Sequence, residues 1–501
     1  MGARLRVLFI VTMRARELFS SLGVVLGSAC GNGLDDSTTS NEDSVTASSA
    51  TSSANETDGV PTGGSVDTGT SAVTWHQDIA PLVIGKCGGC HIHNGIAPFS
   101  LQSYAEAEPF AVAMLAAVER KSMPPFLADE TDECEPRFGW QDDPRVTDDE
   151  LDLLTTWVNA GAPEGEPGNA APLPLPLDLT LKDSDLSLSI DTAVVVDGNK
   201  DMFLCFSLDP GFTTDTWIDG IQIVAGNPRV VHHVLVYLDP EAQSVDLVGP
   251  DGSYPCFGGP GFSNTGLLGA WAPGSIPFEM PPDTAMQVTA GARIILNVHY
   301  HPTGEAEFDS GTGIDLRVFD AALPTYVGLL LLAGNASSAG EGLQPGPNDN
   351  GAPTFVIPAG SVGHTEEMLL SPGGMIPELR IFGVSSHMHY VGTDMLISIR
   401  RNTQVIGSPD VECLLETPNW NFNWQRIYKY NAVLDDVPVA HAGDALYMRC
   451  TYDNSMANPY VVQALTEQGL DAPQDVHLGE ATLDEMCLGV FAVAVKLGDV
   501  I

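Results

Sequence analysis

A histidine pair separated by one residue, His387-Met388-His389, follows the apolar run Leu379 to Val384, which is typical of a β-strand. Alternate side chains of a strand lie on the same face, so the imidazoles of His387 and His389 are expected to point the same way. Two imidazoles on one face make half of a metal site. The other half must come from another part of the chain.

Two other segments carry histidines in or beside apolar runs. His232 and His233 are adjacent in the run Val230 to Val236, and His299 stands in Asn297-Val298-His299-Tyr300-His301. Neighbours on a regular strand face opposite sides, so His232 and His233 can bind one metal ion only if the strand bends there. Taken singly, each histidine is better explained as a hydrogen-bonded core residue than as a ligand.

A different metal chemistry is indicated nearer the N-terminus. Cys87-Gly88-Gly89-Cys90-His91 has the C-x-x-C-H pattern of covalent haem attachment. The two thiols would add to the haem vinyl groups, and His91 would bind the iron from one side. A redox dithiol followed by an unrelated histidine is the alternative, but the context of an exported protein favours haem.

The sixth ligand of the haem iron is expected downstream of this motif. Met123 in Ser122-Met123-Pro124-Pro125-Phe126 follows a helical run and resembles the proline-held methionine ligand of small cytochromes c. A thioether ligand raises the haem potential, which suits electron transfer. A simple core role for Met123 is the alternative. His93 is the rival ligand, although it lies too close to His91 to reach the opposite face easily.

Helical patterns surround the haem motif. The pattern predicts helices over Trp75 to Lys86 and Phe110 to Arg120, and Thr147-Asp148-Asp149-Glu150 is a capping box that opens a helix through Val158. These helices predict a small all-α cytochrome c-like domain over residues 73–162. A linker rich in Pro, Gly and Ala follows over residues 163–180.

The rest of the chain is β in character. Short apolar runs alternate with Gly, Pro, Asn and Asp clusters, which is typical of antiparallel sandwiches. This length is too great for one sandwich, so we expect two, jelly-roll-like in type, over residues 181–322 and 323–501, with the break near Ala321 to Tyr326. The alternating aromatic residues of Asn419 to Gln425 are expected to form one strand face, more often core than pocket.

The amino-acid composition limits the partners and the location that we expect for this protein. With 65 acidic against 21 basic residues the net charge is -44, and such a surface repels nucleic acid and anionic membranes. Residues 1–30 resemble a bacterial lipoprotein signal with Cys30 as the lipidated residue, and an ordinary secretory signal is the alternative. Residues 31–72, rich in Ser and Thr, predict a flexible tether. No later stretch has the ~18 apolar residues of a membrane helix.

The histidine segments, taken together and in order, resemble the type 2 copper, ascorbate-dependent monooxygenases, the family of the peptidylglycine α-hydroxylating and dopamine β-monooxygenases. The resemblance covers about Asp201 to Ala494. It includes Gly269-Ala270-Trp271-Ala272-Pro273 and the segment Asp484-Glu485-Met486-Cys487, which closely resembles the family's "DEMC" segment. By this resemblance the ligands of one copper are His232, His233 and His299, and those of a second copper are His387, His389 and Met486.

The ligand types suit copper on their own chemistry. A neutral thioether is a poor zinc ligand and a good Cu(I) ligand, so a site with two imidazoles and a thioether can cycle between Cu(I) and Cu(II) and offer Cu(I) to dioxygen. A three-histidine site suits an electron store. The resemblance implies a solvent-filled gap between the two coppers and the disulfides Cys450–Cys487 and Cys205–Cys256. Cys134 and Cys413 remain, and the sequence leaves their pairing open.

Two positions depart from the peptide-amidating members of the family. Their carboxylate-binding arginine and tyrosine are replaced here by Ser385 and Val490, so a glycine-extended peptide is an unexpected substrate. Asn297 stands where those enzymes have a glutamine, and it is expected to face the His299 side and hydrogen-bond near that copper.

The sequence thus predicts an exported, lipid-anchored copper monooxygenase of the periplasm or cell surface with its own cytochrome c domain. It would hydroxylate a C–H bond of an unknown small molecule or peptide with O2, using two copper ions, a covalent haem c, and ascorbate or another electron donor. The membrane would be reached only through a lipid anchor, and no nucleic acid is expected as a partner. The alternative is a non-catalytic haem and copper electron-transfer lipoprotein. A zinc hydrolase is a more distant alternative.

Overall fold

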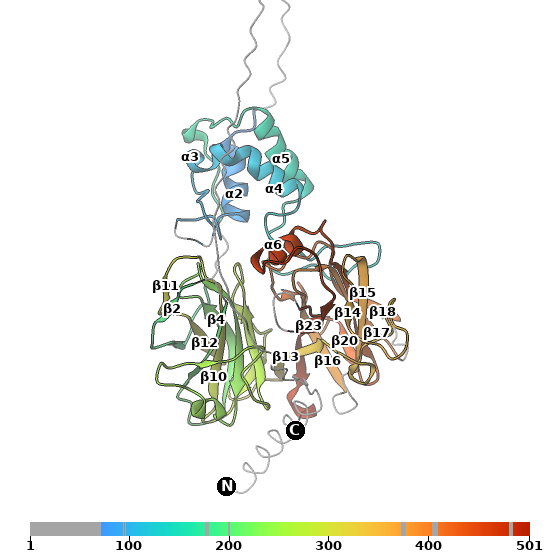
Figure 1. The fold of residues 1–501 in the computed structure, drawn as a ribbon. Helices are drawn as coiled ribbons and strands as arrows, with labels where there is room; N and C mark the ends of the chain where they lie inside the picture. The colour runs from blue at the N-terminus through green and yellow to red at the C-terminus, as the bar shows by residue number, and fades with distance from the viewer. Residues whose placement is uncertain are drawn as a thin grey trace, which may run out of the picture. The chain divides into compact units, whose positions relative to one another are not determined.

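The computed structural model of the chain describes residues 72–93, 95, 97–175, 180–198, 201–371, 377–402, 409–479 and 484–500. The predicted lipoprotein signal (1–30) and the predicted tether (31–72, apart from its last residue) lie outside these described residues. A helical segment comes first, and β-strands make up most of the chain after it (Figure 1). The expected order of a short helical region followed by large, mostly antiparallel β regions is therefore confirmed at this coarse level.

The helical region follows the predicted pattern. Its elements are η1 (Trp75–Ile79), α2 (Ala80–Lys86), α3 (Tyr104–Ala107), η2 (Glu108–Phe110), α4 (Ala111–Glu119), α5 (Asp148–Asn159) and η3 (Pro167–Asn169). The predicted capping box opens α5, because Glu150 N–H donates to Thr147 Oγ1 and Thr147 N–H donates to Glu150 Oε2. Trp75 packs on Trp157 with ring centroids 5.9 Å apart, and both are buried. No described helix is long and apolar enough to span a membrane.

A segment between α4 and α5, residues 126–145, contains no helix and packs against strands that lie far away in the sequence. We name it the docking segment. Trp140 pairs with Tyr430 as an isolated bridge and stacks on its ring at 5.1 Å. Leu127 N–H donates to Tyr428 Oη at 3.1 Å, and Cys134 forms a disulfide with Cys413. The pairing that the sequence left open for these two cysteines therefore joins this segment to the later β region.

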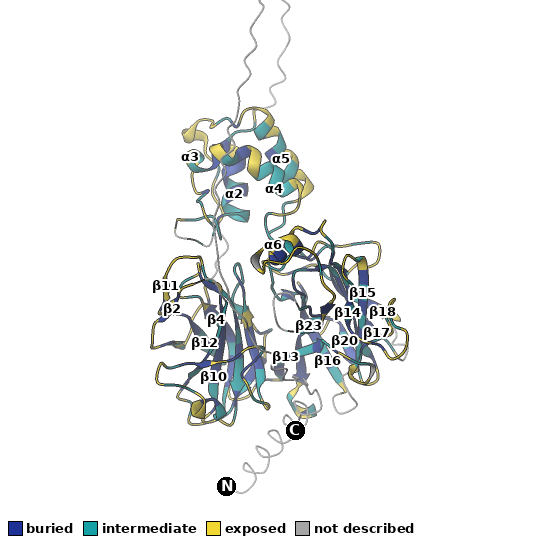
Figure 2. Ribbon diagram, in the orientation of Figure 1, coloured by how far each residue is buried: buried dark blue, intermediate teal, exposed yellow. Residues whose placement is uncertain are grey.

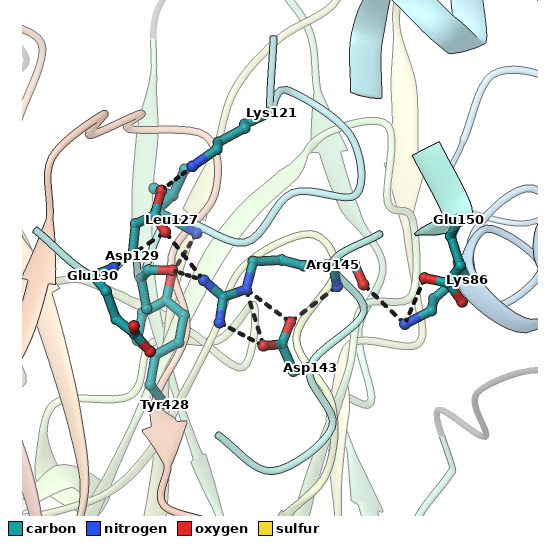
Figure 3. A network of polar contacts seen from close by, with 10 residues as sticks. Lys86, Lys121, Leu127, Asp129, Glu130, Asp143, Arg145, Glu150 and Tyr428 are labelled. Atoms are coloured by element: carbon teal, nitrogen blue, oxygen red, sulfur yellow. Dashed lines mark hydrogen bonds and ion pairs between the residues drawn. The ribbon is translucent and has the colours of Figure 1, made fainter. Parts of the chain in front are cut away.

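Arg145, the last residue of the docking segment, makes several polar contacts with neighbouring residues (Figure 3). Its guanidinium contacts Asp143 at 2.6 Å and Asp129 at 3.3 Å. Its backbone carbonyl accepts a hydrogen bond from Lys86 Nζ at 2.8 Å, and Lys86 also lies 3.7 Å from Glu150. One arginine therefore connects the docking segment with the ends of α2 and α5.

Replacing both cysteines of the docking segment with serine should release it. A disulfide that closes so long a loop stabilises a fold by about 2 to 5 kcal/mol, so the double variant Cys134→Ser/Cys413→Ser should unfold at lower urea concentration. Limited proteolysis should then cut within residues 126–145. The control is Cys205→Ser/Cys256→Ser, which removes a disulfide elsewhere and should leave this segment protected. Continued protection in the first variant would show that the disulfide does not hold the segment.

The N-terminal β region spans residues 186–318. Its strands are β1 (Leu186–Ser189), β2 (Val194–Val196), β3 (Met202–Leu208), β4 (Thr216–Val224), β5 (Val231–Asp239), β6 (Tyr254–Pro255), β7 (Gly266–Trp271), β8 (Phe278–Glu279), β9 (Thr284–Val288), β10 (Arg293–Tyr300), β11 (Glu307–Asp309) and β12 (Gly313–Val318). One run has the order β1-β12-β4-β9 and another β7-β5-β10-β3-β6. A turn of 3-10 helix, η4 (Gln243–Asp246), follows β5. Strand β10 is buried along nearly its whole length because it lies between β3 and β5.

The C-terminal β region spans residues 326–496. Its elements are β13 (Tyr326–Gly334), η5 (Ala339–Glu341), β14 (Val356–Ile357), β15 (Val362–Leu370), β16 (Glu378–His387), β17 (Gly392–Arg400), β18 (Val411–Thr417), β19 (Tyr428–Lys429), β20 (Val439–His441), β21 (Ala445–Asp453), α6 (Pro459–Glu467), β22 (Val476–His477) and β23 (Leu488–Lys496), followed by η6 (Leu497–Asp499). Strands β15-β21-β17-β18 form one sheet, and β16 pairs with β23 in another. Buried residues concentrate in these strands and in those of the N-terminal β region (Figure 2).

Strand β13 belongs to the hydrogen-bonded network of both β regions. It pairs with β23 along its full length, and it also bridges β7 and runs parallel to β9. The interval between Val318, where β12 ends, and Tyr326, where β13 begins, includes the predicted break. The pattern of apolar residues places this loop, but it does not reveal which sheet the next strand joins.

Candidate metal centre

A β-bulge brings the adjacent histidines of β5 to one side of the strand. In the pairing of β5 with β10, His299 lies opposite His233, but the next residue, Tyr300, lies opposite Val231. His232 is therefore the extra residue of a bulge, which breaks the alternation of side chains. Strand β5 therefore has the bend that His232 and His233 need in order to bind one metal ion.

The three imidazoles converge. His233 Nδ1 lies 3.3 Å from His232 Nδ1 and 3.3 Å from His299 Nδ1. One ligand nitrogen from each ring lies within 4.8 Å of the other two, so the group could hold a metal ion. The ring of Phe203, on the neighbouring strand β3, stacks on His299 at 4.3 Å. The predicted ligands His232, His233 and His299 are thus brought together by β5 and β10.

Burial keeps the imidazoles of His232 and His233 neutral, the form that binds metal. Together with the charges of nearby histidines, burial lowers the pKa of His232 to about 4 and the pKa of His233 well below its usual value. Asp201 lies 3.1 Å from His299 Nε2 and 2.7 Å from His301 Nδ1. Burial works to raise the pKa of Asp201, but its hydrogen bonds to these two histidines outweigh burial and lower it. Asp201 therefore orients the His299 ring, and sequence inspection gave it no such role.

The second histidine pair lies at the end of β16. The strand ends at His387, and His389 follows two residues later; the two ring centroids are 5.3 Å apart and the ring planes lie at 87°. His387 Nδ1 donates to Gln425 Oε1 at 2.7 Å, and His389 Nδ1 donates to the Asp484 carbonyl at 3.0 Å. Each hydrogen bond fixes the neutral tautomer with its proton on Nδ1, so Nε2 is the nitrogen that would coordinate a metal. Burial lowers the pKa of His387, and the bond to Gln425 opposes that effect.

The pairing of β16 with β23 brings the backbone of Met486 close to this pair. His387 lies opposite Leu488, so His389 and Met486 both stand just beyond the paired ends of these strands. Glu485 joins the two segments, because its Oε2 accepts the backbone N–H groups of His389 at 2.6 Å and Met486 at 2.7 Å. Met486 is buried. The backbones of the predicted ligands His389 and Met486 are therefore held beside each other.

The aromatic segment Asn419 to Gln425 is not a strand, which corrects the expectation from its alternation. It forms turns and irregular loop between β18, which ends at Thr417, and β19, which begins at Tyr428. Trp420 is buried, and its Nε1 donates to the His389 carbonyl at 3.2 Å. Phe422 is half-buried, stacks on His232 at 5.4 Å and meets His389 edge-on at 5.8 Å. The alternation failed as a predictor because the loop is shaped by contacts with the histidine segments.

The residues of the C-x-x-C-H motif lie after α2. Cys87 and Cys90 form no disulfide, and His91 Nδ1 donates to the Phe99 carbonyl at 3.1 Å, which makes Nε2 the nitrogen available to iron. Burial raises the pKa of Cys87 to about 12. Met123 follows α4, as expected. The rival ligand His93 has a side chain that is 76% exposed and lies 2.9 Å from Glu106, a surface ion pair rather than a buried ligand position.

Three other predicted positions can be placed. Ser385 on β16 lies opposite Val490 on β23, and neither side chain can bind a carboxylate by charge. Asn297 hydrogen-bonds the Cys256 carbonyl at 3.1 Å and the Gly259 carbonyl at 3.3 Å. These hydrogen bonds hold the loop beside the Cys205–Cys256 disulfide rather than a histidine ring.

Gln425, Glu485, Asp201 and Phe422 contact the candidate ligands and were not assigned to the site from the sequence. Glu485 carried the strongest signal, since it directly precedes Met486 in the segment Asp484-Glu485-Met486-Cys487. The other three are remote in sequence from the ligands that they touch. Their role follows from the pairing of the strands.

Comparisons with known proteins add little. No protein-family model matches the chain, and no curated protein does. Among solved structures, the major capsid protein P2 of bacteriophage PM2 matches with 9% sequence identity and a TM-score of 0.22, over 62% of this chain and 97% of the capsid chain. A structure of Sulfolobus turreted icosahedral virus matches with 9% identity and a TM-score of 0.22, over 62% of this chain and 89% of the viral chain.

Proposed function

We propose that this chain is a copper-dependent monooxygenase that hydroxylates a C–H bond of its substrate with O2. The observation that carries the proposal is the bulge in β5, which gathers His232, His233 and His299 around one point. An adjacent pair of histidines has no reason to face one way in an ordinary core strand. A second pair, His387 and His389, with Met486 beside it, gives the donor set that suits Cu(I).

The donor sets at the two centres fit copper, and each set suits a different role for the ion. Three neutral imidazoles at the first centre suit a copper ion that stores an electron. Two imidazoles and a thioether at the second suit the copper that meets O2, whose chemistry is to supply electrons for O–O cleavage. In the balanced reaction one oxygen atom would enter the substrate C–H bond and the other would leave as water, with two electrons from ascorbate or another donor and two protons. Gln425 and the Asp484 carbonyl orient the imidazoles at the second centre.

The substrate is expected to carry no carboxylate at the reacting end. Ser385 and Val490 share the sheet face of His387, and Leu332 lies opposite Val490 on β13. Paired residues of antiparallel strands project to the same side, so this face offers an uncharged surface beside the ligands. A small neutral molecule therefore suits the site better than a peptide with a free C-terminus.

The haem, the type of β fold and the cellular location that the sequence predicts are part of the same proposal. Cys87, Cys90 and His91 would hold a covalent haem with Met123 as its sixth ligand, and the haem would pass electrons toward copper. The two β regions would be jelly-roll-like sandwiches. The three disulfides of the described chain are consistent with export to the periplasm or cell surface on a lipid anchor.

The test is the metal content of protein matured in a periplasm with haem and copper supplied, followed by oxygen consumption with a panel of neutral substrates. We expect two coppers and one haem per chain and a hydroxylated product whose new oxygen derives from ¹⁸O2. One haem with no tightly bound copper would overturn the proposal and favour the electron-transfer lipoprotein. Zinc in place of copper would favour a hydrolase.

A further inference from the structure

The second centre contains a buried carboxylate with an unusual set of partners. Glu485 has 0% exposure. Its Oε2 accepts N–H groups from His389 and Met486, and its Oε1 accepts N–H groups from Val391 at 3.1 Å and Gly392 at 3.2 Å. The carboxyl oxygens of Glu485 thus contact backbone amides, and no ion pair among the residues that the structure describes involves them. Backbone N–H groups that surround a buried carboxyl group satisfy its hydrogen-bonding capacity and offset part of the cost of burying it.

These four amides belong to both ligand-bearing segments. Three lie in the turn from His389 to Gly392, and the fourth belongs to Met486. The same segments have further anchors: Tyr452 Oη donates to the Met486 carbonyl at 2.9 Å, and the Cys450–Cys487 disulfide follows directly. Both anchors hold the Met486 segment to β21. The Glu485 carboxyl group ties the two segments to each other through four backbone amides, alongside the single hydrogen bond from His389 Nδ1 to the Asp484 carbonyl.

We propose that Glu485 is a positioning residue for the second metal centre, fixing the His389 and Met486 backbones at the separation that a metal ion needs. This inference rests on the proposed function, because it assumes that the two residues bind the same ion. The chain, rather than the metal, would set the geometry. A thioether ligand binds weakly, so its coordination depends on being held in place before the metal arrives.

Glu485→Gln tests the inference. The amide keeps the volume of the carboxyl but turns one acceptor into a donor that faces two N–H groups. Cu(I) affinity at the second centre, measured by competition with a Cu(I) chelator, should fall by about 10- to 100-fold, as for other residues that orient ligands. X-ray absorption should show loss of the sulfur contribution, whereas affinity at the three-histidine centre should stay unchanged.

The matched control is Glu366→Gln. Glu366 is also a buried glutamate of the C-terminal β region, with 2% exposure, but it pairs with His364 at 2.8 Å. This variant should lose stability and keep the wild-type Cu(I) affinity. Equal affinity losses in both variants would assign Glu485 a merely structural role and overturn the proposal.

If Glu485→Gln does not fold, hydrogen exchange on the wild-type chain tests the inference instead. The amides of His389, Val391, Gly392 and Met486 should be protected in the copper-free protein and change little when copper is added. Protection that arises only with copper would show that the metal organises the site, against the proposal. If the wild type binds no second copper, the proposed function fails; if it does and Glu485→Gln binds it equally well, only this inference fails.

Discussion

Met486→Ile should abolish oxygen-dependent hydroxylation while the haem spectrum and the copper of the three-histidine centre remain. Isoleucine keeps a buried apolar side chain of similar volume but offers no sulfur, so the Cu(I) state at the second centre loses its soft ligand. We expect turnover to fall by at least about 100-fold, more than for loss of an orienting residue. Product formation and copper content, measured on the same preparation, check this result.

A neighbouring methionine provides the control. Met388 lies between His387 and His389, is fully buried, and belongs to a hydrophobic core that includes Met395 and Trp420. Met388→Leu changes a thioether in the same segment, and a swap of this kind usually costs less than about 1.5 kcal/mol. It should keep most of the activity. Retained hydroxylation in Met486→Ile would refute the assignment of the second centre.

His299→Ala should remove one copper per chain and uncouple the protein from its electron supply. His299 is the ligand on β10, and its loss leaves two imidazoles that lie next to each other on one strand. Copper at the second centre should remain, with its Cu(II) electron paramagnetic resonance signal intact. Hydroxylation under steady turnover should fall by at least about 100-fold, because each cycle needs a second electron.

His301→Ala is the control for this prediction, because it removes a histidine near the site that is not a ligand. His301 lies two residues further along, is about half exposed, and contacts the same carboxylate, Asp201, as His299 does. It is not one of the converging ligands, so its replacement should leave two coppers bound. Loss of copper in His301→Ala, or retention of both coppers in His299→Ala, would contradict the ligand set.

Much of the architecture could be predicted from local pattern. The capping box at Thr147 specified the start of α5 because both of its hydrogen bonds lie within four residues. The apolar runs around His232, His299 and His387 marked β5, β10 and β16 for the same reason, since a short apolar run is a local property of the sequence. Local alternation failed for Asn419 to Gln425, where tertiary contacts of Trp420 and Phe422 override it.

The sequence by itself determined the chemical types and order of the candidate ligands: a C-x-x-C-H motif, three histidines in two segments, and a His-x-His pair with a methionine near the C-terminus. Only the tertiary structure decided how they meet. The bulge at His232 exists only in the register of β5 against β10, and Glu485 joins His389 to Met486 only because β16 pairs with β23. Register is set by which strands become neighbours, and that depends on packing between residues distant in the chain.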